Sequence, residues 1–212
     1  MKKLLGLSCA ALLILFTVTP VMAMPYSIGD TFDAKVLHTG NTAVVKLGNL
    51  GKITAYTNYS LDTEFGIIDA FCVEAVYASG SAQPYTIKIV PDNLAKAAWV
   101  AEQYWFNNDA WGLKKEEAQI AIWELALDST VNLGADNFMY YSGMNISTTS
   151  VQKILTAAFA GPIVNSAWAY NPSFQNYLIK NPAPVPEPGT MLLLGTGLIG
   201  LAGITRKKFK QR

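Results

Sequence analysis

Residues of strand-forming type dominate the first half of this 212-residue chain. The segments 31–37, 42–47 and 52–57 are rich in β-branched and aromatic residues, and glycine-containing turns separate them. The segments 63–78 and 84–90 have the same character. This pattern predicts a strand-rich N-terminal half.

Apolar residues take on a helical spacing of three and four after residue 91. Segment 92–104 has an apolar stripe and begins with Asp92, which can cap a helix. Segment 114–127 is the clearest predicted helix, and segment 150–158 is a third. Segment 163–179 fits a strand or a helix. We therefore expect an α+β fold: a β-sandwich or a barrel-like strand-rich body with an inserted block of about three helices.

The chain begins with a basic residue pair followed by an uninterrupted apolar run. Lys2 and Lys3 precede the apolar segment 4–18, and Ala23 ends a stretch of the kind that signal peptidase cleaves. We therefore expect residues 1–23 to be a signal peptide and the body to be exported across the inner membrane.

The last residues form three successive zones. Residues 181–189 are proline-rich, residues 190–205 are apolar without a charge, and residues 206–212 are basic, beginning with Arg206, Lys207 and Lys208. A helix over 190–205 would rise ~24 Å, slightly less than a ~30 Å hydrocarbon core. This pattern predicts a short transmembrane helix, with the basic residues as a cytoplasmic stop.

The three zones resemble the PEP-CTERM signals of Gram-negative bacteria, with Pro186, Glu187 and Pro188 as the sorting triplet. The resemblance implies a substrate of the membrane transpeptidase exosortase. Such a protein would be held in the inner membrane for a time and then delivered to the cell surface or to a biofilm matrix.

The net charge of +1 conceals an uneven distribution of charged residues. Without the signal peptide and tail, residues 24–184 carry a net charge of −5 and contain no arginine. A surface of this kind lacks the clustered cations that bind phosphates, so we expect no nucleic-acid partner. Residues 24–180 have the length of one extracellular domain.

Cys72 is the only cysteine outside the predicted signal peptide, since Cys9 lies within it. An exported domain with one cysteine cannot form an internal disulfide. Cys72 could therefore be a packed core residue, an intermolecular partner or a reactive thiol.

Two short motifs favour a reactive thiol. Cys72 follows Phe71, and residues 119–123 read Gln-Ile-Ala-Ile-Trp. This pair of motifs resembles the thioester domains of bacterial surface adhesins, which implies Cys72 as the thioester cysteine and Gln119 as the acyl donor. Ala118 stands where those adhesins often have threonine.

In such a domain the cysteine sulfur attacks the glutamine carboxamide and ammonia leaves. An amine or hydroxyl group of an extracellular protein or polysaccharide then captures the thioester, which is a single-turnover attachment rather than enzymatic catalysis. The thioester must be shielded from water, and the sequence offers a supporting aromatic shell: Phe71, Trp99, Tyr104 and Trp123.

Other functions fit the same sequence. The domain could be a noncovalent structural or carbohydrate-binding matrix module in which Cys72 is merely packed. A cysteine hydrolase would have to use His38, the only histidine, but its neighbours predict a solvent-exposed turn. One cysteine and one histidine exclude the usual zinc sites, and no cofactor motif is present.

Overall fold

The computed structural model describes residues 26–180 except residues 77, 135 and 165. The predicted signal peptide, linker, sorting triplet, apolar helix and basic stop lie outside the described residues. Within those residues, no helix combines the length and the apolar character needed to cross a membrane.

Six strands form a closed antiparallel barrel in the order β1-β4-β5-β9-β8-β6. Their bounds are β1 Thr31–His38, β4 Tyr59–Thr63, β5 Gly66–Cys72, β6 Gln83–Ile89, β8 Ala167–Tyr170 and β9 Tyr177–Ile179. Side chains alternate along β1, where Phe32, Ala34 and Val36 are buried and the residues between them are exposed. This period of two buries one face of β1 in the barrel interior, whereas β8 and β9 are buried at consecutive positions.

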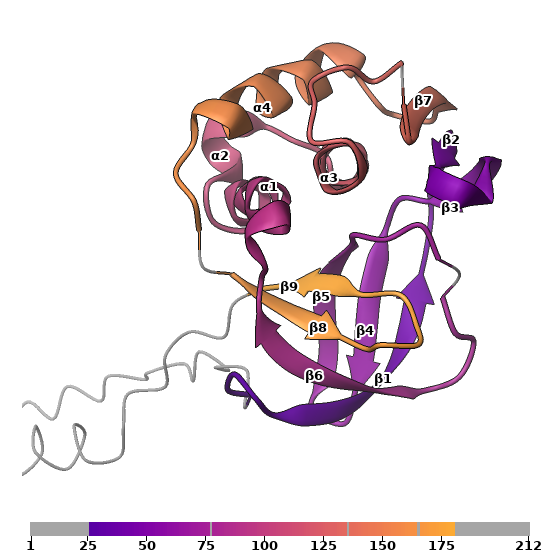
Figure 1. The fold of residues 1–212 in the computed structure, drawn as a ribbon, viewed down its shortest axis with the longest axis vertical. Coiled ribbons are helices and arrows are strands. Elements are labelled where there is room, and N and C mark those ends of the chain that lie inside the picture. Colours follow the sequence, from indigo (N-terminus) through magenta and orange to yellow (C-terminus); the bar gives the residue numbers. More distant parts are fainter. Residues whose placement is uncertain (1–25, 77, 135, 165, 181–212) are drawn as a thin grey trace, which may run out of the picture.

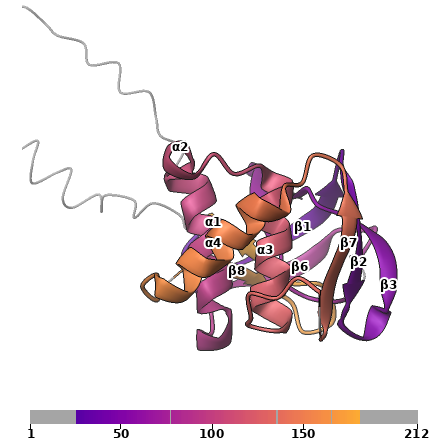
Figure 2. The same cartoon turned by 90° about the horizontal axis from the view of Figure 1, so that it is seen from above.

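A second, three-stranded sheet has the order β3-β2-β7. Its strands are β2 Thr42–Leu47, β3 Lys52–Tyr56 and β7 Phe138–Gly143, and the short 3-10 helix η1 Gly48–Leu50 connects β2 with β3. β2 alternates between buried and half-buried residues, with Val45 fully enclosed. Figures 1 and 2 show this sheet at one edge of the molecule, next to α3.

The helices gather on one side of the barrel (Figure 1). They are α1 Ala95–Phe106, the short α2 Asn108–Trp111, α3 Lys115–Leu127 and α4 Thr148–Ala160, and the 3-10 helix η2 Asp92–Leu94 precedes α1. Residues 115–125 of α3 are all buried, because α1, α4, β5 and β7 surround this helix. A helix enclosed on every side has no need of an amphipathic stripe.

The expected α+β class and the barrel-like body are confirmed, with four helices rather than about three. Of the predicted strand over 63–78, Thr63 ends β4 and only Gly66–Cys72 form a strand, β5. The two strands make a hairpin whose turn ends at Gly66, with a φ of +115°. Segment 163–179, left open by its sequence, forms β8 and β9. α1 begins at Ala95 rather than at Asp92, which opens the 3-10 turn instead.

Candidate functional site

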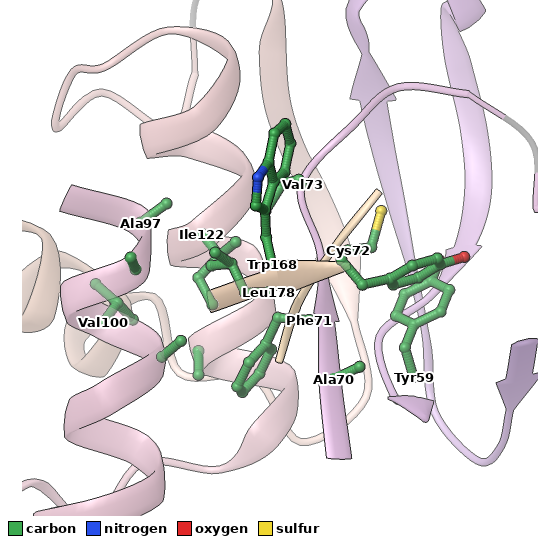
Figure 3. Packing of buried hydrophobic residues seen from close by; sticks show 14 of the residues in the cluster. Tyr59, Ala70, Phe71, Cys72, Val73, Ala97, Val100, Ile122, Trp168 and Leu178 are labelled. Carbon is green, nitrogen blue, oxygen red and sulfur yellow. The ribbon is translucent and has the colours of Figure 1, made fainter. Parts of the chain in front are cut away.

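Cys72 is the last residue of β5 and lies where the barrel meets the helices. It pairs with Tyr177 of β9, and its side chain is fully buried. Figure 3 shows it within the hydrophobic cluster, with Tyr59 on its barrel side. Among the described residues, the only cysteine thus lies at the end of a strand that helices cover.

Gln119 lies on α3 and is also fully buried. Its carboxamide is paired with the backbone of Cys72: Oε1 accepts the Cys72 N–H at 3.0 Å, and Nε2 donates to the Cys72 carbonyl at 2.8 Å. The structure therefore brings together the two residues that the motifs single out, 47 positions apart in the sequence.

The Cys72 sulfur has two polar neighbours. The Trp123 indole N–H donates to Sγ at 3.3 Å, and Sγ lies 3.3 Å from the Glu74 carbonyl oxygen, to which the thiol donates. Burial raises the pKa of the Cys72 thiol to about 12, against a smaller opposing effect of the Trp123 bond. At neutral pH the thiol is therefore protonated, so the sulfur must lose its proton as it attacks.

The predicted aromatic shell is only partly assembled. Trp123 contacts the sulfur, whereas Phe71 points to the opposite face of β5 (Figure 3) and packs there on Tyr104 and Trp105, with ring centroids 5.4 Å apart in both pairs. Trp99 lies elsewhere, because its ring packs on Trp111 at 6.0 Å and against Gly161.

Two tyrosines that the motifs did not indicate complete the surroundings. Tyr59 lies edge-on to Trp123, with ring centroids 6.4 Å apart, and 5.9 Å from Tyr177. Burial is the main reason why both tyrosine pKa values are raised, and the nearby Cys72 raises them further. They occur at ordinary inward-facing strand positions, so no sequence signal distinguishes them from other core aromatics.

A buried lysine fixes the first turn of α3 to the barrel. Lys115 Nζ donates to the Tyr59 carbonyl at 2.5 Å and forms an ion pair with Asp69 on β5. The second Asp69 oxygen accepts the Trp105 indole N–H at 2.8 Å. This cluster anchors α3 to β5 at Lys115, one helical turn before Gln119. It therefore fixes the position along β5 at which the Gln119 carboxamide makes its contacts.

Glu124, which its sequence context suggests is a surface carboxylate, is fully buried. One carboxyl oxygen accepts the Thr130 hydroxyl, and the other has no hydrogen-bond partner among the described residues. Burial raises the pKa of Glu124 to about 7. This residue supports the loop after α3, and no bond connects it to Cys72.

His38 ends β1 and stacks on Tyr56 with ring centroids 4.0 Å apart. It is exposed, as expected for a solvent-facing histidine, and makes no hydrogen bond to Cys72. Among residues 26–180, leaving aside the three gaps, no cluster of His, Cys, Asp and Glu side chains could hold a metal ion.

In a comparison with protein families, residues 184–207 match the PEP-CTERM protein-sorting motif. No curated protein and no solved structure gives a significant match. The matched segment contains the triplet Pro186, Glu187 and Pro188, and it implies export, exosortase-dependent processing at the membrane and sorting to the surface of a Gram-negative cell.

Proposed function

We propose that the domain delivered by this sorting signal attaches itself covalently to an extracellular partner through a thioester between Cys72 and Gln119. The observation that carries the proposal is the paired contact of the Gln119 carboxamide with the Cys72 backbone, with both side chains fully buried.

The contacts favour formation of the thioester. Attack of Sγ on the Gln119 side-chain carbon makes a C–S bond and places negative charge on Oε1, which the Cys72 N–H already contacts at 3.0 Å. A preformed donor at this position lowers the barrier in the way an oxyanion hole does. The thiol proton passes to Nε2 as the C–N bond breaks, and ammonia leaves.

The same contacts favour capture of the thioester by an acceptor. A neutral amine attacks the acyl carbon, the C–N bond forms and the C–S bond breaks. The departing sulfur receives the indole N–H bond of Trp123. Because the buried thiol of Cys72 has a pKa of about 12, the released thiolate takes up the proton that the amine nitrogen loses. The acceptor remains bound to residue 119 by an amide bond, so the domain reacts once and does not turn over.

A different surface supports a second candidate, the noncovalent carbohydrate-binding matrix module. An open groove of about 840 Å³ runs along α4 and carries one aromatic ring among hydroxyl and amide side chains: Trp111, Thr148, Thr149, Gln152 and Thr156. Sugar rings bind to surfaces that combine an apolar ring with hydrogen-bonding groups. Under this alternative, Cys72 and Gln119 serve only to join α3 to β5.

Intact mass spectrometry of the freshly purified mature domain separates the two candidates. We expect a mass lower by one ammonia than the sequence requires, restored to the full value in Cys72→Ala and in Gln119→Ala. Methylamine should then add one equivalent to the wild-type chain alone. A full-mass wild-type domain whose Cys72 is alkylated once unfolded would contradict the thioester.

A further inference from the structure

A small pocket of about 240 Å³ opens between the second sheet and the barrel. β3 supplies one wall, and the end of β1, the start of β4 and the residues Val76 and Ala78 supply the others. Its lining is mostly apolar and aromatic: Leu47, Leu50, Ile53, Ala55, Tyr56, Tyr59, Val76 and Ala78, with His38, Thr54 and Gln175 as the polar members.

Two residues of the lining also belong to the surroundings of the Cys72 sulfur. Tyr59 packs on Trp123, which donates to Sγ. Gln175 donates to the Glu74 carbonyl at 3.3 Å, and the Cys72 thiol donates to that same oxygen. One layer of side chains therefore separates the pocket from the sulfur.

We propose that this pocket is the passage through which the acceptor reaches the Cys72–Gln119 pair, and that it selects a primary amine at the end of an unbranched aliphatic stem. This inference rests on the proposed function, because it assigns an entrance to the same site.

The lining explains the choice of acceptor. A slender alkyl stem can lie against Leu47, Ile53 and Val76, whereas a sugar would bury several hydroxyl groups without partners. No Asp, Glu, Lys or Arg belongs to the described lining, so no carboxylate there can pair with an ammonium ion. The amine therefore enters in its neutral, nucleophilic form. In the capture step the nitrogen bonds to the acyl carbon, the C–S bond breaks, and the amine proton moves to Sγ.

The innermost wall must yield for the acceptor to pass. Tyr59 and Gln175 are almost fully buried. Gln175 donates a hydrogen bond to the Val76 carbonyl and accepts one from the Tyr177 hydroxyl. Displacement of these two side chains opens the passage, so the same layer that admits an acceptor excludes water from the thioester at other times.

Val76→Trp tests the passage, with Val131→Trp as the matched control. Both valines are exposed, at 45% and 41%, but only Val76 lines the pocket. In the mature domain we expect Val76→Trp to keep the ammonia-mass deficit and to slow methylamine capture at least about tenfold, as loss of correct approach does. Val131→Trp should react at the wild-type rate. In the wild type, n-butylamine should react faster than tert-butylamine, and glucose should not react.

A second readout does not depend on the thioester. After methylamine treatment the Cys72 thiol is free whether or not a thioester had formed, and its modification by methyl methanethiosulfonate reports access to the sulfur. We expect Val76→Trp, and not Val131→Trp, to slow this modification. Absence of the mass deficit with slowed modification would overturn the covalent function while leaving the passage in place. Equal rates in Val76→Trp and the wild type in both assays would overturn the passage.

Discussion

Both polar atoms of the Gln119 side chain form hydrogen bonds with the backbone of Cys72. The Cys72→Ala variant keeps these bonds, since they involve the N–H and carbonyl of residue 72 and not its sulfur. Gln119→Ala leaves a buried donor and a buried acceptor unpaired, at about 1–3 kcal/mol each. Cys72→Ala is therefore the cleaner variant for testing the chemistry, and Gln119→Ala also reports the stability that the pairing provides.

Glu124 gives the domain a pH-dependent stability. Its pKa is about 7 in the folded chain, raised chiefly by burial from an ordinary value of 4.5. The folded state thus holds the proton where the unfolded chain has lost it, and the contribution of Glu124 to the free energy of unfolding falls as pH rises from about 4.5 to about 7.

We expect Glu124→Gln to remove this dependence, because the amide stays neutral and still accepts the Thr130 hydroxyl bond. Thermal melts at pH 5 and pH 8 would show the variant gaining in Tm relative to wild type at the higher pH. The exposed Glu64→Gln serves as the control. An equal difference between variant and wild type at both pH values would contradict the assignment.

Among the contacts between elements, α1 packs closely against the end of α4. Gly161 ends α4, and a Cβ at this position would lie 2.7 Å from the Trp99 ring of α1. Lys96 of α1 donates to the Gly161 carbonyl at 2.7 Å, so the backbone is held in place there. The glycine is needed for close approach and not for its φ, which is −71°.

Gly161→Ala should therefore destabilise the domain by about 1–3 kcal/mol, the usual effect of overpacking a core contact. Gly80→Ala is the matched control, since a Cβ there meets nothing within 4 Å. Urea unfolding measures the free energy of unfolding of both variants. Equal midpoints for Gly161→Ala and the wild type would mean that Trp99 moves aside without cost.

The sequence pattern predicts elements where local periodicity and global packing agree. The first three strands and α3 are such cases, because their residue types suit their structure and their bounds fall within a residue or two of those observed. β7 was not predicted, since it acquires strand structure by pairing with β2, whose partner residues are 91 to 100 positions away. Closure of the barrel likewise depends on β9, a strand of three residues that no periodicity can reveal.

The candidate site likewise contains residues that the sequence could reveal and residues that only the fold reveals. Cys72 and Gln119 could be found because an unpaired exported cysteine and a short motif stand out in a sequence. Lys115, Asp69 and Gln175 could not, because a buried lysine, an aspartate in a strand and a glutamine in a loop look like surface residues until the fold places them. Their roles come from contacts between segments distant in sequence.

At the scale of the whole molecule, an acidic body is joined to a basic tail that carries the sorting motif. Replacing Pro186, Glu187 and Pro188 by alanine should block exosortase processing, because it removes the triplet and leaves residues 190–205 unchanged. Immunoblots of membrane and surface fractions from a host with exosortase would show the unprocessed chain retained in the membrane.

Alanine at Pro182 is the control, since this proline lies in the same linker but precedes the matched segment 184–207. A host without exosortase should show the retained form for every variant. Normal surface delivery of the triplet variant would mean that the tail acts only as an anchor.

β9 gives the domain a mechanical property. It is the last described strand, and it is hydrogen-bonded on one side to β5, with Tyr177 opposite Cys72 and Ile179 opposite Ala70. A pull on the C-terminal segment would act along this antiparallel ladder and shear its bonds together, with Lys115 and Gln119 linking β5 to α3. If residue 119 carries the acceptor, tension between cell and partner would run from β9 through β5 to α3, and β8, which pairs with the other side of β9, would share the load at that strand.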